Sequence, residues 1–208
     1  MTDIIAADPG HPVKPSRYHP ALVALHWFLA AFIVLALGLG MFVLKTIPKS
    51  SAHKIEALRA HMIGAGVILT LMVTRLAIRV LSARPEPATA GNPVLDRIAR
   101  ISHLAFYGLV AGMVATGLAT AVLTDLPSIV FSGSGASLPG SFTVFPTRVL
   151  HGVIAKIFVA LIAVHAAAAF YHHFVLRDGL LRRMWFGRRW TALERIPAEP
   201  AHARSHAT

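Results

Sequence analysis

Residues 151–173, "HGVIAKIFVALIAVHAAAAFYHH", decide how this chain folds, because they are apolar enough to lie in lipid yet carry four histidines and a lysine. Ionisable side chains at membrane depth are costly and are usually retained for function. His151 and His165 are fourteen residues apart, an interval that advances about 21 Å along an α-helix and completes almost four turns. We therefore expect both side chains on one face of a membrane-spanning helix, one near each membrane boundary.

Four windows of the chain are long and apolar: 22–44, 60–81, 98–123 and 148–174. Each exceeds the roughly 20 residues that a hydrocarbon core of about 30 Å requires. The 208 residues are 55% hydrophobic and only 14% charged, whereas a soluble domain carries about 25% charged residues. The sequence therefore predicts an all-α membrane protein, a bundle of four transmembrane helices. The first window is too long for a cleaved signal peptide.

The distribution of lysine and arginine predicts the topology, because cytoplasmic segments carry the excess of these residues. One side of the predicted bundle has thirteen: Lys14, Arg17, Arg79, Arg84, Arg97, Arg100, Arg177, Arg182, Arg183, Arg188, Arg189, Arg195 and Arg204. The other side has five: Lys45, Lys49, Lys54, Arg59 and Arg148. We expect both termini to be cytoplasmic, with an N-terminal tail at 1–20, the membrane domain at 21–176 and a basic C-terminal tail at 177–208.

Two features of the composition exclude other classes of protein. The chain has no cysteine, so thiolate catalysis, iron–sulfur clusters, disulfides and c-type haem attachment are ruled out. Its formal net charge is +11, but basic residues at the ends of membrane helices follow from the positive-inside rule, and we expect no nucleic-acid partner.

The histidines of different windows fall at two matched depths. His26, near the cytoplasmic start of the first window, lies at the depth of His165, and His61, which opens the second, lies at the depth of His151. Two imidazoles on facing helices of an apolar bundle can hold a haem b iron from both faces. The small residues in "HMIGAG", "HG" and "HAAAA" lower the helix surface beside these histidines, as the approach of a flat macrocycle requires.

Other interpretations of these histidines remain open. Each could bond a backbone carbonyl or mark a helix interface. A metal transporter would also use membrane histidines, but carboxylate partners are then expected, and no Asp or Glu lies within the four windows.

Two basic residues within the windows are candidate partners for haem propionates. Arg75 is fourteen residues after His61 and so shares its helix face at cytoplasmic depth; it could pair with a propionate of the inner haem or extend to the interface. Lys156 could extend outward or meet a propionate of the outer haem. His103 matches no partner by depth, so we expect a structural or quinone-site role rather than iron ligation.

These residues resemble the bacterial cytochrome b561 family, diheme four-helix membrane cytochromes, over roughly residues 17–190. The first two helices contribute "RYHPALVALHW" and "RAHMIGAGVILTLMVTRLAIR", and the third contributes "ARISHLAFYGLVAGMVATGL". The fourth contributes "LHGVIAKIFVALIAVHAAAAFYHHFVLRDGLLRRM". The fourteen-residue interval between histidines, followed by "HH" and "RDGLLRRM", is the most specific element. The longer N-terminal tail, the extended loop 124–147 and Lys156 depart from the compact form of the family.

The resemblance implies a protein of the bacterial inner membrane with two haems b. It implies His26, His61, His151 and His165 as axial ligands, and electron exchange with the ubiquinone pool. A functional analogue is superoxide oxidase, which oxidises superoxide at the periplasmic face and reduces ubiquinone. The alternative is an electron-relay cytochrome b subunit docked to a partner dehydrogenase or hydrogenase, and a third interpretation is a haem-free transporter.

Both faces of the bundle offer candidate substrate sites. Outer-face cations could attract an anionic donor such as superoxide or be ordinary juxtamembrane charge; these cations are Lys45, Lys49, Lys54 and Arg59. Near the inner haem level, hydrogen-bond donors for a quinone are expected from His173, His172, Trp27 and His103. Loop 124–147, rich in Gly and Ser, is expected to be irregular and close to the membrane surface.

Overall fold

The computed structural model describes residues 16–83, 85 and 93–187, and this part of the chain contains helices and no β-strand. The helices are α1 (Pro20–Gly38), α2 (Leu44–Thr46), α3 (Ala52–Leu81), α4 (Pro93–Leu123), α5 (Leu126–Phe131), α6 (Pro146–Tyr171) and α7 (Leu180–Arg183). Two π-helical segments, Leu39–Val43 and His172–Leu176, extend α1 and α6. Among these residues, four stretches are long and apolar enough to cross a membrane: Pro20–Thr46, Ala52–Leu81, Pro93–Leu123 and Pro146–Leu176. The predicted four-helix membrane fold is confirmed.

The helices begin where local chemistry favours a start, which makes the spans longer than the apolar windows. Three helices start at a proline, whose missing N–H costs nothing in the first turn. The helix α3 starts eight residues before its apolar window because Ser51 caps it, accepting a hydrogen bond from the backbone N–H of His53 (3.3 Å). Residues 52–59, which precede that window, are therefore helical.

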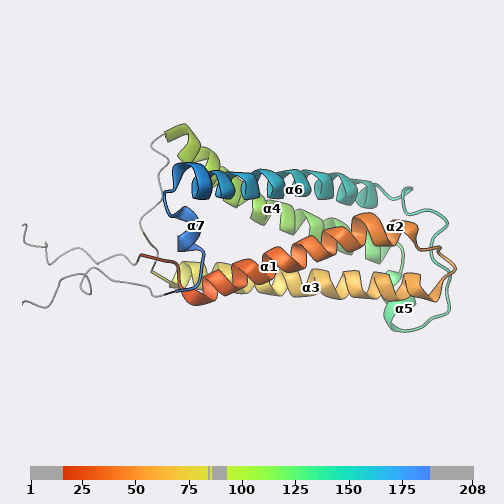
Figure 1. Ribbon diagram of the computed structural model, residues 1–208. Coiled ribbons are helices and arrows are strands. Elements are labelled where there is room, and N and C mark those ends of the chain that lie inside the picture. Colours follow the sequence, from red (N-terminus) through yellow and green to blue (C-terminus); the bar gives the residue numbers. More distant parts are fainter. Residues whose placement is uncertain (1–15, 84, 86–92, 188–208) are drawn as a thin grey trace, which may run out of the picture.

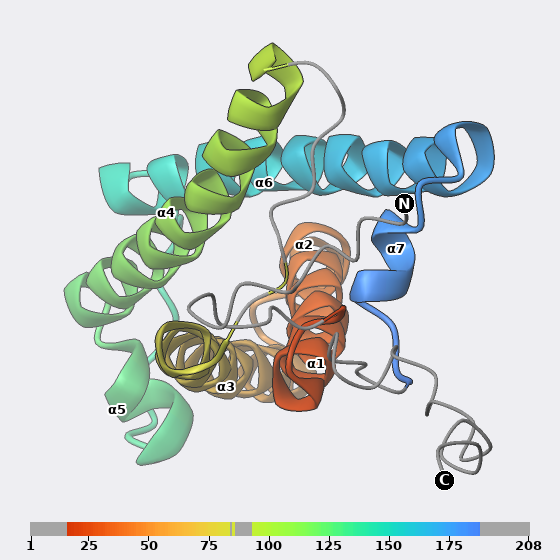
Figure 2. The same cartoon turned by 90° about the vertical axis from the view of Figure 1, so that its left-hand side faces the viewer.

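The four spans pack as two pairs of helices. The helix α1 packs along α3, and α4 packs along α6, whereas the two pairs contact each other much less (Figures 1 and 2). The pairs meet at a buried layer formed by one residue from each span: Leu29, Ile68, Val110 and Phe158. Phe158 lies seven residues from both His151 and His165, so this layer sits midway between the two depths at which histidines were predicted.

At one end of the bundle, α5 packs against α3 and α4 (Figure 1). Leu126 and Val130 of α5 are buried with Ala121 of α4. Its composition predicted that the segment 124–147 is irregular. This is wrong for Leu126–Phe131, which form a helix. Pro127 in the first turn and the burial of one apolar face explain the short helix.

At the other end, the segment 177–187 folds back onto the start of α1 (Figure 2). The indole Nε1 of Trp27 donates a hydrogen bond to the carbonyl of Met184 (2.9 Å). Arg17 Nη1 donates to the carbonyls of Trp185 and Phe186 (3.2 Å each). Part of the predicted C-terminal tail thus covers this end of the bundle, while residues 1–15 and 188–208 of the two predicted tails lie outside the described residues.

Candidate haem-binding sites

Two pairs of histidines face each other across the bundle. The ring centres of His61 on α3 and His151 on α6 are 6.2 Å apart, with the ring planes inclined at 73°. Those of His26 on α1 and His165 on α6 are 6.4 Å apart and inclined at 66°. The structure thus brings together the residues that the sequence paired by depth, and α6 supplies one member of each pair.

Both separations suit a metal ion held between two imidazoles. A metal–imidazole nitrogen bond is about 2.0 Å and the ring centre lies about 1.1 Å further away, so two rings on opposite sides of one metal ion have centres about 6.2 Å apart. In the described part of the chain, no group of three or more His, Asp or Glu side chains could hold a metal ion. A pair of imidazoles without further protein ligands fits a metal that brings its equatorial ligands with it, as the iron of a macrocycle does.

Two glycines lie directly against the His61/His151 pair. A Cβ atom on Gly40 would lie 3.1 Å from Cε1 of His61, and one on Gly117 would lie 3.2 Å from Cε1 of His151. Both distances are tighter than ordinary van der Waals contact, so only glycine leaves these rings in place. The Nδ1 atoms differ, because His151 Nδ1 lies 3.1 Å from the hydroxyl of Thr116 whereas His61 Nδ1 is buried without a partner.

Each pair has an arginine nearby. Arg75 interacts electrostatically with His26 and His165. It donates a hydrogen bond to the hydroxyl of Tyr107 (2.9 Å), while its buried Nε has no hydrogen-bond partner. This N–H suits an incoming carboxylate such as a propionate.

Beside the His61/His151 pair, Arg148 and the predicted candidate Lys156 are placed differently. Arg148 interacts with the rings of both His61 and His151. Lys156 lies on an exposed face of α6, five residues from His151, and so points to lipid rather than along the histidine face. Of the two, Arg148 is the better placed partner for an anionic group beside the His61/His151 pair.

A third imidazole adjoins the His26/His165 pair. The ring centre of His103 on α4 lies 5.7 Å from that of His165. Its Nδ1 is 2.7 Å from the carbonyl oxygen of Ala99, an acceptor that requires Nδ1 to carry the proton. His103 is therefore bound to its own helix through Nδ1, and this bond does not use its Nε2.

A model of the prokaryotic cytochrome b561 family matches residues 17–187. The chain belongs to this family. It is 29% identical to cytochrome b561 homolog 2 of Escherichia coli strain K12, over 82% of this chain and 92% of the relative. It is 25% identical to the probable superoxide oxidase CybB of Yersinia pestis, over 81% and 95%, and to cytochrome b561 homolog 1 of E. coli strain K12, over 81% and 97%.

Membership of the cytochrome b561 family makes the chain a bacterial membrane cytochrome that carries b-type haem. The imidazole pairs fit this group on three observations. Their separation suits two ligands of one metal ion, no group of three or more His, Asp or Glu among the described residues could hold a metal ion, and the Nε of Arg75 has no partner.

The sequence interpretation missed several residues that surround the His61/His151 pair. Arg148 was counted only for topology, although it precedes His151 by three residues and so lies on the same helix face. Gly40 and Gly117 lie on other helices than the rings that they adjoin. The spacing of residues within one helix therefore could not predict these contacts. The same holds for Thr116, which lies on α4.

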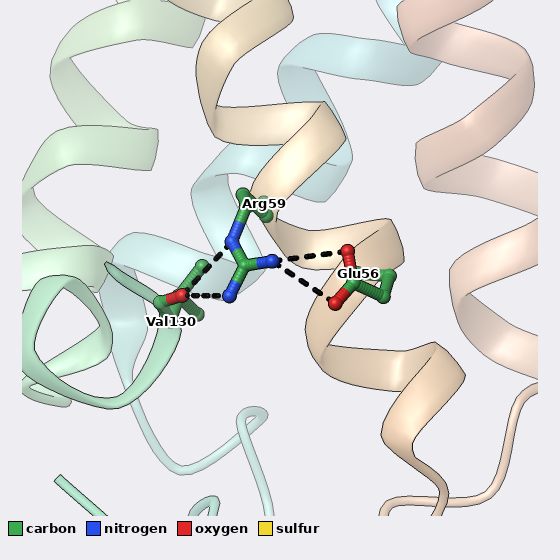
Figure 3. Close-up of polar contacts among 3 residues, drawn as sticks. All are labelled: Glu56, Arg59 and Val130. Carbon is green, nitrogen blue, oxygen red and sulfur yellow. Dashed lines mark hydrogen bonds and ion pairs between the residues drawn. The ribbon is translucent and has the colours of Figure 1, made fainter. Parts of the chain in front are cut away.

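The cations expected to attract an anion at the α5 end are largely engaged in structural contacts. Lys54 is buried and donates to the backbone carbonyls of Leu44 and Ile47, and Lys49 donates to the carbonyls of residues 139 and 140. Arg59 pairs with Glu56 (2.9 Å) and donates to the carbonyl of Val130 (2.6 and 3.0 Å) (Figure 3). These three side chains are therefore held by structural contacts, which favours the alternative of ordinary juxtamembrane charge.

Proposed function

We propose that this cytochrome b561 carries two haems b and transfers electrons across the membrane between a periplasmic donor and the quinone pool. His61 and His151 would hold the iron of one haem, and His26 and His165 that of the other. The observation that carries the proposal is the pair of facing imidazoles at each end of α6, with ring centres 6.2 and 6.4 Å apart.

The spacing along α6 supports transfer through the bundle. His151 and His165 are separated by about 21 Å of helix, with Phe158 and its layer of apolar neighbours between them. This layer excludes water from the middle of the bundle, and the histidines hold the two redox groups on either side of it. When bound, each haem supplies an iron that accepts and releases one electron.

Charged side chains hold the propionate groups in this proposal. Arg75 would hold a propionate beside His26 and His165 through its unpartnered Nε, with its guanidinium kept in place by the hydrogen bond to Tyr107. Arg148, which interacts electrostatically with His61 and His151, would hold a propionate beside that pair. Lys156, the other candidate, extends toward the interface.

A quinone site is proposed at the end of the bundle where α1 starts and α6 ends. Two of the four candidate donors have other partners there: Trp27 bonds the carbonyl of Met184 and His172 pairs with Asp178. His173 is exposed, and His103 has its Nε2 open. These two imidazoles can donate a hydrogen bond to a quinone carbonyl and supply a proton.

Two electron donors are candidates, one suggested by a relative and the other by the contacts at the α5 end. One relative is named a probable superoxide oxidase, which supports superoxide as donor at the α5 end. The structural engagement of Lys49, Lys54 and Arg59 favours the second candidate, a relay subunit that receives electrons from a docked dehydrogenase. Purified protein that reduces added quinone with superoxide supports the first function, whereas protein that carries haem but is inert alone supports the second.

The haem content tests the proposal directly. Pyridine haemochrome analysis of the purified protein is expected to give two haems b per chain. One haem, or none, in folded protein contradicts the proposal.

The orientation is tested separately. A reporter fused after Thr208 is expected to report a cytoplasmic C-terminus, since thirteen Lys and Arg side chains were assigned to that side against five. A periplasmic signal would exchange the donor and quinone ends while leaving the two haem sites unchanged.

A further inference from the structure

We propose that Thr116 is a positioning residue that fixes the orientation and tautomer of the His151 ring, so that its Nε2 faces the iron. The inference rests on the proposed function, because it takes His151 as an axial ligand.

The hydrogen bonds of Thr116 define which atom carries the proton. Its hydroxyl Oγ1 lies 2.6 Å from the carbonyl oxygen of Gly112 and 3.2 Å from that of Met113. A hydroxyl has one proton and a carbonyl oxygen can only accept, so the proton of Thr116 points to α4's own backbone. Toward His151 Nδ1, 3.1 Å away, the hydroxyl can then act only as an acceptor.

This arrangement places the ring proton of His151 on Nδ1. With Nδ1 protonated, the lone pair of a neutral imidazole is on Nε2, which is the atom that binds metal when the other nitrogen donates a hydrogen bond. Thr116 is buried (9% exposed), so water does not compete for this contact.

The facing ligand lacks such a partner. His61 Nδ1 is buried and has no hydrogen bond, and its ring is limited instead by close contact with Gly40. The two axial ligands of one iron are therefore held differently, one by a hydrogen bond and one by shape. An acceptor at the outer ring nitrogen raises the basicity of the ligand and so favours the oxidised iron.

The helix α4 supplies a matched control. Thr120 lies one turn beyond Thr116 and is also buried (5% exposed). Its hydroxyl donates to the carbonyl of Thr116 (2.8 Å) and accepts from the hydroxyl of Thr147 (2.9 Å). No contact joins Thr120 to a histidine among the described residues. Thr120→Val therefore removes a buried hydroxyl from the same helix without touching the proposed role.

The test compares Thr116→Val, Thr116→Ser and Thr120→Val by haem content and by the midpoint potential of each haem in an optical redox titration. Thr116→Val is expected to shift one midpoint potential to a more positive value and to lower haem retention at that site about tenfold or more. If the oxidised state alone is weakened tenfold, the shift is about 59 mV. Thr116→Ser keeps the acceptor and is expected to match the wild type, as is Thr120→Val.

Repeating the titration in a His26→Ala background identifies the affected haem, because only the His61/His151 haem is expected to remain. A shift in Thr116→Val that Thr120→Val reproduces, no shift, or a shift confined to the other haem overturns the inference. If Thr116→Val does not fold, a Thr116→Ser variant that loses the wild-type potential overturns it as well. A wild type with fewer than two haems refutes the proposed function, and this inference with it.

Discussion

The two histidine pairs have nearly the same internal geometry but different surroundings. At the α5 end, the rings of His61 and His151 contact two glycines, and one ring is bonded to a threonine. At the other end, His165 faces both His26 and His103, and no hydrogen bond to either member of the pair is present among the described residues. The difference teaches that the period of α6 sets the distance between the two pairs. The neighbouring helices decide how firmly each ring is held.

The largest expected effect comes from removing one ligand of each pair. His151→Ala is expected to remove mainly the haem at the α5 end, and His165→Ala mainly the other, as each change leaves one iron with a single imidazole. His61→Ala is expected to reproduce the spectral loss of His151→Ala, and His26→Ala that of His165→Ala. Haem content and optical spectra of purified variants measure both losses. Because the haem contributes to the bundle core, thermal stability is expected to fall too.

His103 provides a second test of the pairing, because the structure places it close to His165. Its ring is 5.7 Å from His165, against 6.4 Å for His26, so distance alone leaves it a rival ligand. Its bond from Nδ1 to the carbonyl of Ala99 leaves Nε2 free, as in a ligand, so only the matched depth of His26 and His165 separates the two candidates. On that ground we expect that His103→Ala keeps both haems. Loss of a haem in that variant, or in His173→Ala, would refute the pairing by depth.

A smaller effect is expected from filling the space beside one ring. The Cβ atom introduced by Gly117→Ala lies 3.2 Å from His151 Cε1, so the ring must shift by a few tenths of an ångström. Overpacking of this kind costs about 1–3 kcal/mol, and we expect weaker haem binding at the α5 end only. Gly108→Ala on the same helix meets no atom within 4 Å and is the matched control for haem titration of the apoprotein. Equal haem affinity in the two variants would contradict the close fit of the ring.

The fold and the pairing could be predicted from the sequence because both are periodic. Apolar length identified the four spans, and the fourteen-residue interval placed His151 and His165 on one face. What could not be predicted depends on contacts between helices. Neither Thr116 nor Gly117 is near His151 in the sequence. The cations of the α5 end illustrate the same limit: charge counting could not show that Lys54 is buried against backbone carbonyls.

The segments that cover the two ends of the bundle, α5 and residues 177–187, can be compared by their contribution to stability. At the α5 end, Arg59 donates two hydrogen bonds to the carbonyl of Val130, one of the last carbonyls of α5, which have no partner within the helix. Arg59→Met is expected to lower the free energy of unfolding by about 2 kcal/mol, the value of a hydrogen bond from a charged group. Chemical unfolding in detergent measures it. Glu56→Gln, which removes only the exposed partner (Figure 3), is expected to change stability by less than about 1 kcal/mol. Similar losses in both variants would mean that Arg59 does not anchor α5.

The cover at the opposite end is expected to depend on pH, with the smallest effect of all. Partial burial raises the pKa of the Asp178 carboxyl, but its hydrogen bonds with His172 and the backbone N–H of Leu180 outweigh this, so the pKa lies below its usual value. A carboxyl with a lowered pKa stabilises the folded state fully above the ordinary value of about 3.9 and loses this contribution as the pH falls through the folded value. We therefore expect the segment 177–187 to become more susceptible to proteolysis under acid conditions, with an acid protease as probe. Asp178→Asn is expected to weaken the cover at neutral pH and to flatten its acid dependence, whereas Arg59→Met leaves that dependence unchanged. An unaltered acid profile in Asp178→Asn would show that the contact with His172 does not hold the segment in place.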